Sequence, residues 1–182
     1  RDFDQRIRKL LGTSEPISYV VELKIDGVAV TLLYRGGNLE YGATRGNGTQ
    51  GDIITNNLLT LPQIRRRLPA WQAPADGVLE VRGEVYLPYP EFLAWNEELK
   101  AQNQQLLANP RNAAAGLLKR LDPQFVAKRR LEFIAHGRGE VVGWEVETHF
   151  DFLQRVGLLG IPSSPLLQVA RDILEVEKIL KD

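Results

Sequence analysis

Apolar and polar residues follow two different periods along this chain, and each period predicts a kind of element. Alternation with a period of two predicts β-strands, whereas apolar residues three to four positions apart predict amphipathic helices. The strands are expected at 19–27, 28–34, 39–45, 78–87 and 131–137. The helices are expected at 1–11, 52–59, 90–105, 109–116, 148–156 and 170–180. Because strands and helices are interspersed and short turns join neighbouring strands, the pattern predicts the α+β class, with antiparallel β-sheets flanked by helices.

Glycines and charges add detail to this pattern. The RGGN run between the second and third strands is a hairpin signal, because consecutive glycines favour the tight turns that reverse a strand. In the strand at 78–87, Glu80, Arg82 and Glu84 share one face. Their mutual pairing is one interpretation, and a functional role for the two acids is the alternative. Gly83 lies on the opposite, apolar face and predicts close approach by another backbone.

The first strand carries the main candidate for chemistry. Glu22 and Lys24 lie two positions apart and therefore point to the same face, and Asp26-Gly27 turns the chain directly afterwards. A lysine held on a strand beside carboxylates suits covalent catalysis, because its backbone is fixed and its neighbours can tune its charge. The alternative is an ordinary half-buried strand with an ion pair on its polar face, since a Lys-x-Asp-Gly run is short enough to arise by chance.

Two further segments have the composition of anion-binding sites. The loop at 44–52 is rich in glycine, so its amides can approach a ligand closely, and Arg45 enters it from the end of a strand. A plain connector with a solvated arginine accounts for the same loop equally well. In the helix at 109–116, Asn109 is the expected cap. Arg111 then lies at the positive end of the helix dipole, a placement that makes sense where the arginine helps to hold an anion.

Composition narrows the class of protein. The chain has 182 residues with 23 basic and 23 acidic side chains, and this balance argues against an autonomous nucleic-acid binder that relies on net positive charge. The arginine run at 65–67 is interpreted as a solvated helix end. The absence of cysteine excludes disulfides and thiolate chemistry and fits a cytoplasmic location, and no apolar run reaches membrane-spanning length. Because methionine is absent too, we interpret the chain as a segment of a longer protein.

Several motifs, taken together, resemble those of one family. They are ELKIDG at 22–27, ATRGNG at 43–48, VRGEV at 81–85 and NPRNAAAG at 109–116. Their order and spacing are similar to those of the bacterial NAD⁺-dependent DNA ligases over essentially the whole chain. The Lys-x-Asp-Gly element is shared with ATP-dependent ligases and capping enzymes, whereas the NPRNAAAG run points to the NAD⁺ branch.

The resemblance implies the adenylation (nucleotidyltransferase) domain of such a ligase, with the ATP-grasp-like fold of DNA ligase catalytic cores. Lys24 would attack the α-phosphorus of NAD⁺, release nicotinamide mononucleotide and become lysyl-AMP, with Mg²⁺ as the metal cofactor. AMP would then pass to the 5′-phosphate of nicked double-stranded DNA, in DNA replication and repair. Asp26 would support the lysine as a second catalytic residue. No residue is assigned as a metal ligand, and a monomer is expected.

The same resemblance implies which side chains bind the nucleotide. Glu22 would contact the adenine, and His136 would stack on it in place of the tyrosine that is common in the family. Arg45 and Glu84 would hold the AMP, with Glu84 at the ribose, and Arg111 would assist at the phosphate. These roles agree with the chemistry, because arginines and a metal ion stabilise the charge that develops on the phosphoryl oxygens.

Departures from the family pattern limit these expectations. Residues 117–120 are LLKR where the family has Ser-Leu-Arg-Gln, so Lys119 keeps the charge of the usual arginine but not its bidentate fork. The chain at 1–182 is also expected to end before the last two catalytic motifs of the domain. It is expected to lack the upstream module that binds nicotinamide mononucleotide and the downstream OB, zinc and helix-hairpin-helix parts. By itself the chain would therefore be expected to seal few nicks in DNA, or none.

Two other functions stay open at the level of sequence. An ATP- or GTP-dependent polynucleotide ligase, or a capping-type nucleotidyltransferase, would use the same lysine with a different nucleotide. A non-catalytic nucleotide- or DNA-binding module descended from a ligase would not need Lys24. The NPRNAAAG run argues against the first alternative, and the complete set of motif residues argues against the second.

Overall fold

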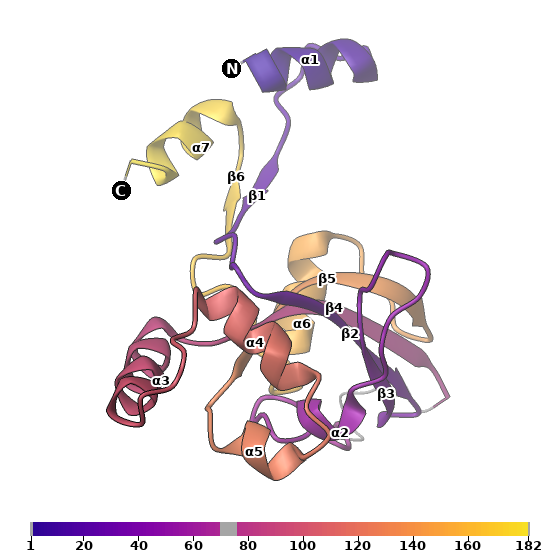
Figure 1. Cartoon of the computed structure of the whole chain (residues 1–182). Coiled ribbons are helices and arrows are strands. Elements are labelled where there is room, and N and C mark those ends of the chain that lie inside the picture. The colour runs from indigo at the N-terminus through magenta and orange to yellow at the C-terminus, as the bar shows by residue number, and fades with distance from the viewer. Residues whose placement is uncertain (1, 70–75, 182) are drawn as a thin grey trace.

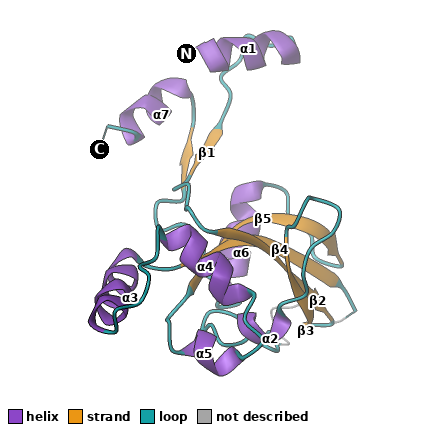
Figure 2. Ribbon diagram, viewed as in Figure 1, coloured by secondary structure: helices purple, strands orange, loops and turns teal. Residues whose placement is uncertain are grey.

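A four-stranded antiparallel sheet forms the centre of the computed structural model, which describes residues 2–69 and 76–181. Its strands lie in the order β3-β2-β4-β5. They are β2 (Val28–Arg35), β3 (Asn38–Thr44), β4 (Val78–Tyr86) and β5 (Glu132–Val142). The β2–β3 hairpin turns at Gly36 and Gly37, which both have positive φ, so the predicted hairpin is confirmed. Figure 2 shows helices gathered around this sheet, and the predicted α+β class with antiparallel sheets is confirmed as well.

One face of the sheet contributes to the apolar core. Val81 and Val85 of β4 are fully buried, and they alternate with polar residues as the sequence pattern predicts. Gly83 continues their row: a Cβ at Gly83 would lie 2.3 Å from the Phe133 ring and 2.4 Å from the Ile134 carbonyl oxygen. The predicted close approach at Gly83 is therefore confirmed, because the missing side chain lets Phe133 of β5 pack directly onto β4.

The helices that pack on the sheet begin at recognisable caps. They are α2 (Thr55–Leu58), α3 (Tyr89–Ala101), α4 (Pro110–Leu118), α5 (Pro123–Ala127) and α6 (His149–Leu158). Asn109 caps α4 by accepting a 2.8 Å hydrogen bond from the Asn112 amide, and Thr148 forms a capping box with Asp151 at the start of α6. In Figure 2, α4 lies beside the sheet, α2 and α5 lie lower, and α6 packs against β5. The predicted cap at Asn109 is thus confirmed.

A separate two-stranded ribbon joins the two ends of the described chain. β1 (Tyr19–Val21) pairs antiparallel with β6 (Gln168–Ala170), α1 (Asp2–Leu11) precedes β1, and α7 (Ile173–Ile179) follows β6. Figure 1 shows α1 and α7 beyond the end of this ribbon, away from the four-stranded sheet. The ribbon therefore holds the segment that follows β1 beside the segment that precedes β6.

The contact between α1 and β1 depends on one buried carboxylate. Asp4 is 5% exposed, and its Oδ1 accepts a 2.6 Å hydrogen bond from the Tyr19 hydroxyl. Its Oδ2 accepts a 2.8 Å hydrogen bond from Nε of Arg8. The hydrogen bond from Tyr19, with help from Arg8, holds the pKa of Asp4 below the ordinary value of 3.8, although burial acts in the opposite direction.

We expect α1 to stay docked on β1 at neutral pH and to detach in strong acid. A carboxyl group whose pKa is lower in the folded state adds stability above its ordinary pKa and loses this contribution as the pH falls through the lowered value. Hydrogen-exchange protection of the α1 amides, followed from neutral to acid pH, should therefore fall at the acid end. Tyr19→Phe should show reduced protection already at neutral pH, and equal protection at both ends of the pH range would contradict this account.

The lysine segment differs from its predicted structure. β1 ends at Val21, so Lys24 lies in an irregular stretch between β1 and β2 rather than on a strand. The reason is that β6 offers only three residues as pairing partners, which leaves residues 22–27 without a neighbouring strand on that side. Leu23, which in a strand would lie on the face opposite Glu22 and Lys24, is 44% exposed.

Other boundaries also differ from the prediction. The helix predicted at 52–59 begins only at Thr55 with Ile54 as its N-cap, and the amide of Asp52 donates to Thr44 Oγ1. α7 begins only at Ile173, because residues 168–170 pair with β1, and α6 continues through the predicted stop at Gly157. The arginines at 65–67 are exposed as predicted, but they do not lie at the end of a helix. Among the described residues, no helix combines the length and apolar character needed to cross a membrane.

Candidate functional site

A cleft of about 780 Å³ brings the predicted nucleotide-binding residues together. Its walls come from the segment between β1 and β2, the loop after β3, the strands β4 and β5, and the helix α4. The nucleotide-binding residues expected from the sequence all line it: Glu22, Lys24, Arg45, Glu84, Arg111 and His136. The volume is within the usual range for a small-molecule site.

Lys24 presents a free amine to this cleft. Within residues 2–69 and 76–181, its side chain forms no ion pair and no hydrogen bond, and it is exposed. The segment that carries Lys24 is held by packing rather than by hydrogen bonds to a neighbouring strand. Gly27 is buried, and a Cβ there would lie 2.3 Å from the Val85 carbonyl oxygen. The segment that carries Lys24 is thus held closely against the end of β4. The alternative interpretation of Lys24 as half of a structural ion pair is wrong.

The glycine-rich loop after β3 is closed by its own hydrogen bonds. The amide of Arg45 donates to the Ala29 carbonyl at 2.9 Å, which fixes the start of the loop to β2. Oδ1 of Asn47 accepts a 2.9 Å hydrogen bond from the Gln50 amide. A Cβ at Gly46, whose φ is +54°, would lie 1.7 Å from the Gln50 carbonyl oxygen. The loop is therefore a defined turn that directs Arg45 along the cleft wall, which favours a ligand-facing loop over a plain connector.

Arg111 lies at the start of α4 and forms an ion pair at the edge of the cleft. Its Nη1 is 3.0 Å from Oδ1 of Asp26, and both side chains are more than half exposed. An exposed pair of this kind contributes about 0–1 kcal/mol, so an anionic ligand can compete for the guanidinium. Asp26 is not among the residues that line the cleft, and the structure places its carboxylate on Arg111 at the rim.

The two acidic residues of β4 have different partners. Oε1 of Glu80 is 2.9 Å from Nε of Arg82, so the predicted mutual pairing is confirmed for these two side chains. Glu84 does not join them: its side chain is 14% exposed, lines the cleft, and lies 3.7 Å from Nε2 of His136 on β5. The two residues predicted to meet the ribose and the base are therefore neighbours on adjacent strands.

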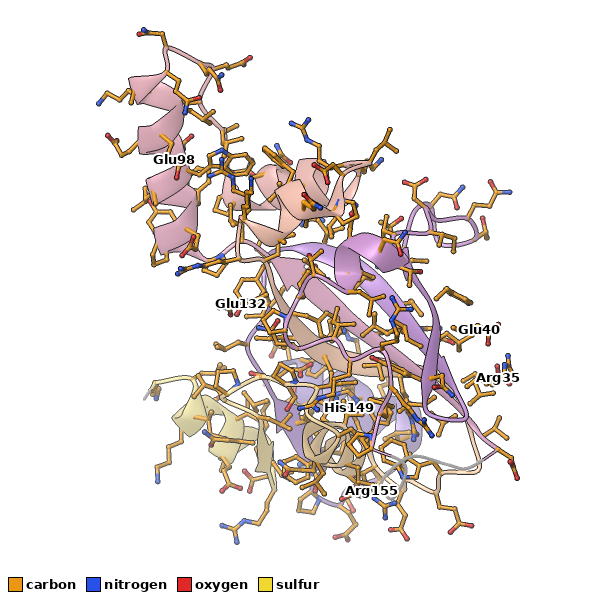
Figure 3. All side chains as sticks on the ribbon, turned by 90° about the horizontal axis from the view of Figure 1, so that it is seen from below. Arg35, Glu40, Glu98, Glu132, His149 and Arg155 are labelled. Atoms are coloured by element: carbon orange, nitrogen blue, oxygen red, sulfur yellow. The ribbon has the colours of Figure 1, made fainter. Side chains whose placement is uncertain are left out.

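Glu22 offers a buried acceptor beside the cleft. Its Oε2 is inaccessible to solvent and accepts no hydrogen bond from any described residue. Its Oε1 lies 4.0 Å from Nε2 of His149, the first residue of α6, which Figure 3 labels. A buried carboxylate oxygen without a donor is costly, because its hydration is lost and not replaced. The structure therefore leaves this oxygen as a buried acceptor without a donor among the described residues.

One polar residue of the cleft was not predicted from the sequence. Ser164, in the segment between α6 and β6, is 5% exposed and lines the cleft beside Glu22. It is flanked by Ser163 and by prolines, and no motif or period in the sequence singles it out. Only the ribbon formed by β1 and β6 brings the chain at 164 next to the chain at 22.

Lys119, where the sequence departs from the family pattern, is not part of the cleft. Its Nζ is 3.5 Å from Oδ2 of Asp52, and both side chains border a second hollow of about 520 Å³ near the end of α4. In the described part of the chain, no three carboxylate or imidazole groups converge on one point.

The fold and the cleft define a class of protein. The cleft of this α+β domain combines an unpaired lysine, two arginines, two carboxylates and an imidazole. Such a set has donors for anionic groups and acceptors for a polar ring, which are the groups that a nucleotide carries. Residues 1–182 match the NAD-dependent DNA ligase adenylation domain, over the whole chain. The chain therefore belongs to the family of NAD-dependent DNA ligase adenylation domains.

Individual relatives agree with this assignment. The chain is 50% identical over 160 residues to a DNA ligase of Shouchella clausii, with 88% of the chain and 23% of that ligase covered. It is 42% identical over 192 residues to a DNA ligase of Roseiflexus sp. (98% of the chain, 26% of the ligase). It is also 42% identical over 182 residues to a DNA ligase of Paenarthrobacter aurescens (100% of the chain, 23% of the ligase). The chain thus spans about a quarter of the length of these relatives.

Proposed function

We propose that this chain is the part of a NAD⁺-dependent DNA ligase that takes up AMP, with Lys24 as the nucleophile. The observation that carries the proposal is the unpaired amine of Lys24 in a cleft with two arginines. After loss of a proton, the amine attacks the α-phosphorus of NAD⁺. A nitrogen–phosphorus bond forms, the bond from that phosphorus to the bridging oxygen breaks, and nicotinamide mononucleotide leaves with the bonding electrons.

The other cleft residues take roles that follow from their charge and position. Arg45 and Arg111 are donors for the phosphate oxygens, where negative charge develops during transfer. Glu84 accepts hydrogen bonds from the ribose hydroxyls, and His136, 3.7 Å away, stacks on the base. Asp26 acts through Arg111, because its carboxylate orients the guanidinium at the rim of the cleft. Glu22, which lines the cleft, meets the adenine.

In this site Mg²⁺ would be bound mainly by the phosphates of the nucleotide. Mg²⁺ usually binds one or two protein carboxylates, with substrate phosphates and water as its other ligands. Residues 2–69 and 76–181 contain no cluster of three candidate ligands, so they supply no closed metal cage. The ion would screen charge on the phosphates and thereby assist the two arginines.

The complete reaction is proposed for a protein of the relatives' length. There, AMP would pass from Lys24 to the 5′-phosphate of a nick in double-stranded DNA, and the adjacent hydroxyl would then displace AMP to close the strand. The proposed architecture is the nucleotidyltransferase fold of ligase catalytic cores, acting as a monomer. The relatives' name, DNA ligase, supports the DNA substrate.

A comparison of nucleotide donors tests the proposal. The chain, and a protein of full ligase length that contains it, would be incubated with Mg²⁺ and NAD⁺, ATP or GTP, each labelled in the α-phosphate. We expect label from NAD⁺ alone, on the tryptic peptide that contains Lys24, with loss of nicotinamide mononucleotide. Label from ATP or GTP instead would establish the ATP- or GTP-dependent alternative. A full-length protein that takes no label from any donor would be a binding module.

A further inference from the structure

The backbone that carries Lys24 is held by few hydrogen bonds. β1 ends at Val21 and β2 begins at Val28, so residues 22–27 pair with no strand. Among the described residues, a single hydrogen bond reaches the backbone of residues 22–26: the amide of Leu23 donates to Oγ of Ser164 at 3.1 Å. Because Leu23 directly precedes Lys24, this bond holds the chain one residue before the proposed nucleophile.

Ser164 belongs to a segment that is itself anchored on the central sheet. Its Oγ also accepts a 3.3 Å hydrogen bond from the amide of Leu166, which closes a short turn around the serine. Just before this turn, the carbonyl oxygen of Pro162 accepts a 2.8 Å hydrogen bond from the amide of Ala135 in β5. The hydroxyl of Ser164 therefore connects the lysine segment to the edge strand of the sheet, across more than 130 residues of sequence.

The hydrogen bond between Leu23 and Ser164 is shielded from solvent. Ser164 is 5% exposed, so water cannot freely replace its hydroxyl if that group is removed. The other contacts close to Lys24 lie on its C-terminal side, where Gly27 packs against β4 and Asp26 forms an exposed ion pair. Ser164 thus supplies the backbone contact on the N-terminal side.

The position of a nucleophile decides the rate of its reaction more than the affinity for the substrate. Reacting atoms must come within about 3–3.5 Å of each other, and a misplacement of about 1 Å can slow a reaction by roughly 100-fold. The stem of a lysine is flexible, so the place from which its amine starts depends on how firmly its backbone is held.

We propose that Ser164 is a positioning residue for the nucleophile. By accepting the hydrogen bond from Leu23, it fixes the backbone from which Lys24 reaches the α-phosphorus. The inference rests on the function proposed above, because it takes Lys24 as the nucleophile. Ser164 also lines the cleft, so a direct contact with the nucleotide is the alternative. The two roles differ in their effect: a contact made equally before and during the reaction changes affinity, whereas positioning changes the rate of the bound complex.

Single-turnover kinetics of adduct formation test this inference. A protein of full ligase length that contains the chain would be mixed with Mg²⁺ and increasing NAD⁺, as unmodified protein, Ser164→Ala and Ser163→Ala. We expect the maximum rate of Ser164→Ala to fall by about 10- to 100-fold, while the half-saturating NAD⁺ concentration stays within about two-fold. Ser163→Ala makes the same chemical change one residue away, outside the cleft, and should react at the unmodified rate.

The amplitude of the reaction separates positioning from a loss of folded protein. A fraction of unfolded variant lowers the final amount of adduct but not the rate constant, so we expect Ser164→Ala to be slow at full amplitude. Ser164→Thr keeps the hydroxyl and should recover most of the rate. A folded Ser164→Thr protein that is as slow as Ser164→Ala would show that the hydroxyl does not act, and this result would overturn the inference.

The remaining outcomes distinguish this inference from the proposed function. If Ser164→Ala needs more NAD⁺ but keeps the maximum rate, the serine binds the nucleotide directly and the positioning role is wrong. If Ser164→Ala behaves like the unmodified protein, the inference fails and the proposed function stands. If the unmodified full-length protein forms no adduct on Lys24, the proposed function fails and the inference fails with it.

Discussion

Replacement of Lys24 by alanine should abolish formation of the AMP adduct while leaving the fold intact. The side chain is exposed and has no partner among the described residues, so its removal breaks no contact that stabilises the protein. The nucleophile, by contrast, cannot be replaced by water without loss of the covalent intermediate. We expect the rate of adduct formation from NAD⁺ to fall by on the order of 10⁴-fold or more. Intact-protein mass spectrometry measures the adduct, and thermal unfolding checks the fold.

Two matched variants decide whether the nucleophile or its charge matters. Lys24→Arg keeps a positive charge in the cleft but offers no nucleophilic amine, so it should be as inactive as the alanine variant. Lys100→Ala removes an exposed lysine from the last turn of α3, outside the cleft, and should react at the unmodified rate. An adduct that persists in Lys24→Ala would mean that another side chain carries the AMP.

Phe133→Ala should cause the largest loss of stability. The Phe133 ring is fully buried and packs directly on Gly83 of the neighbouring strand, where no other side chain can fill the space. Truncation of a buried phenylalanine removes its transfer free energy and leaves a cavity, which together cost about 3–5 kcal/mol. Urea unfolding followed by circular dichroism should show a lower midpoint with little change in slope.

Leu121→Ala provides the comparison for this variant. Leu121 is 100% exposed, so its truncation should change the free energy of unfolding by less than about 0.5 kcal/mol. If Phe133→Ala lowers the free energy of unfolding as little as Leu121→Ala does, the ring does not lie in the interior between β4 and β5. The register of those two strands would then be wrong.

Much of the fold was predictable because the signals for it are local. The RGGN hairpin, the Asn109 and Thr148 caps, and the apolar alternation along β4 each depend on residues a few positions apart. Gly83 was informative because a glycine in an apolar row leaves a gap that a neighbouring strand must fill. The signals failed where pairing depends on a distant partner: the sequence cannot show that β6 is too short to extend β1 past Val21.

The candidate site, like the fold, was only partly predictable from the sequence. The sequence alone determined which residues belong to the site, because the reactivity and charge of lysine, arginine and carboxylate side chains depend first on residue type. The residues expected to bind the nucleotide all line the cleft: Glu22, Lys24, Arg45, Glu84, Arg111 and His136. Only the tertiary structure decided that Asp26 lies on Arg111 at the rim, that Lys119 lies elsewhere, and that Ser164 joins Glu22. The physical reason is that contacts between segments far apart in the chain depend on how the ribbon and sheet pack, and no local pattern records that packing.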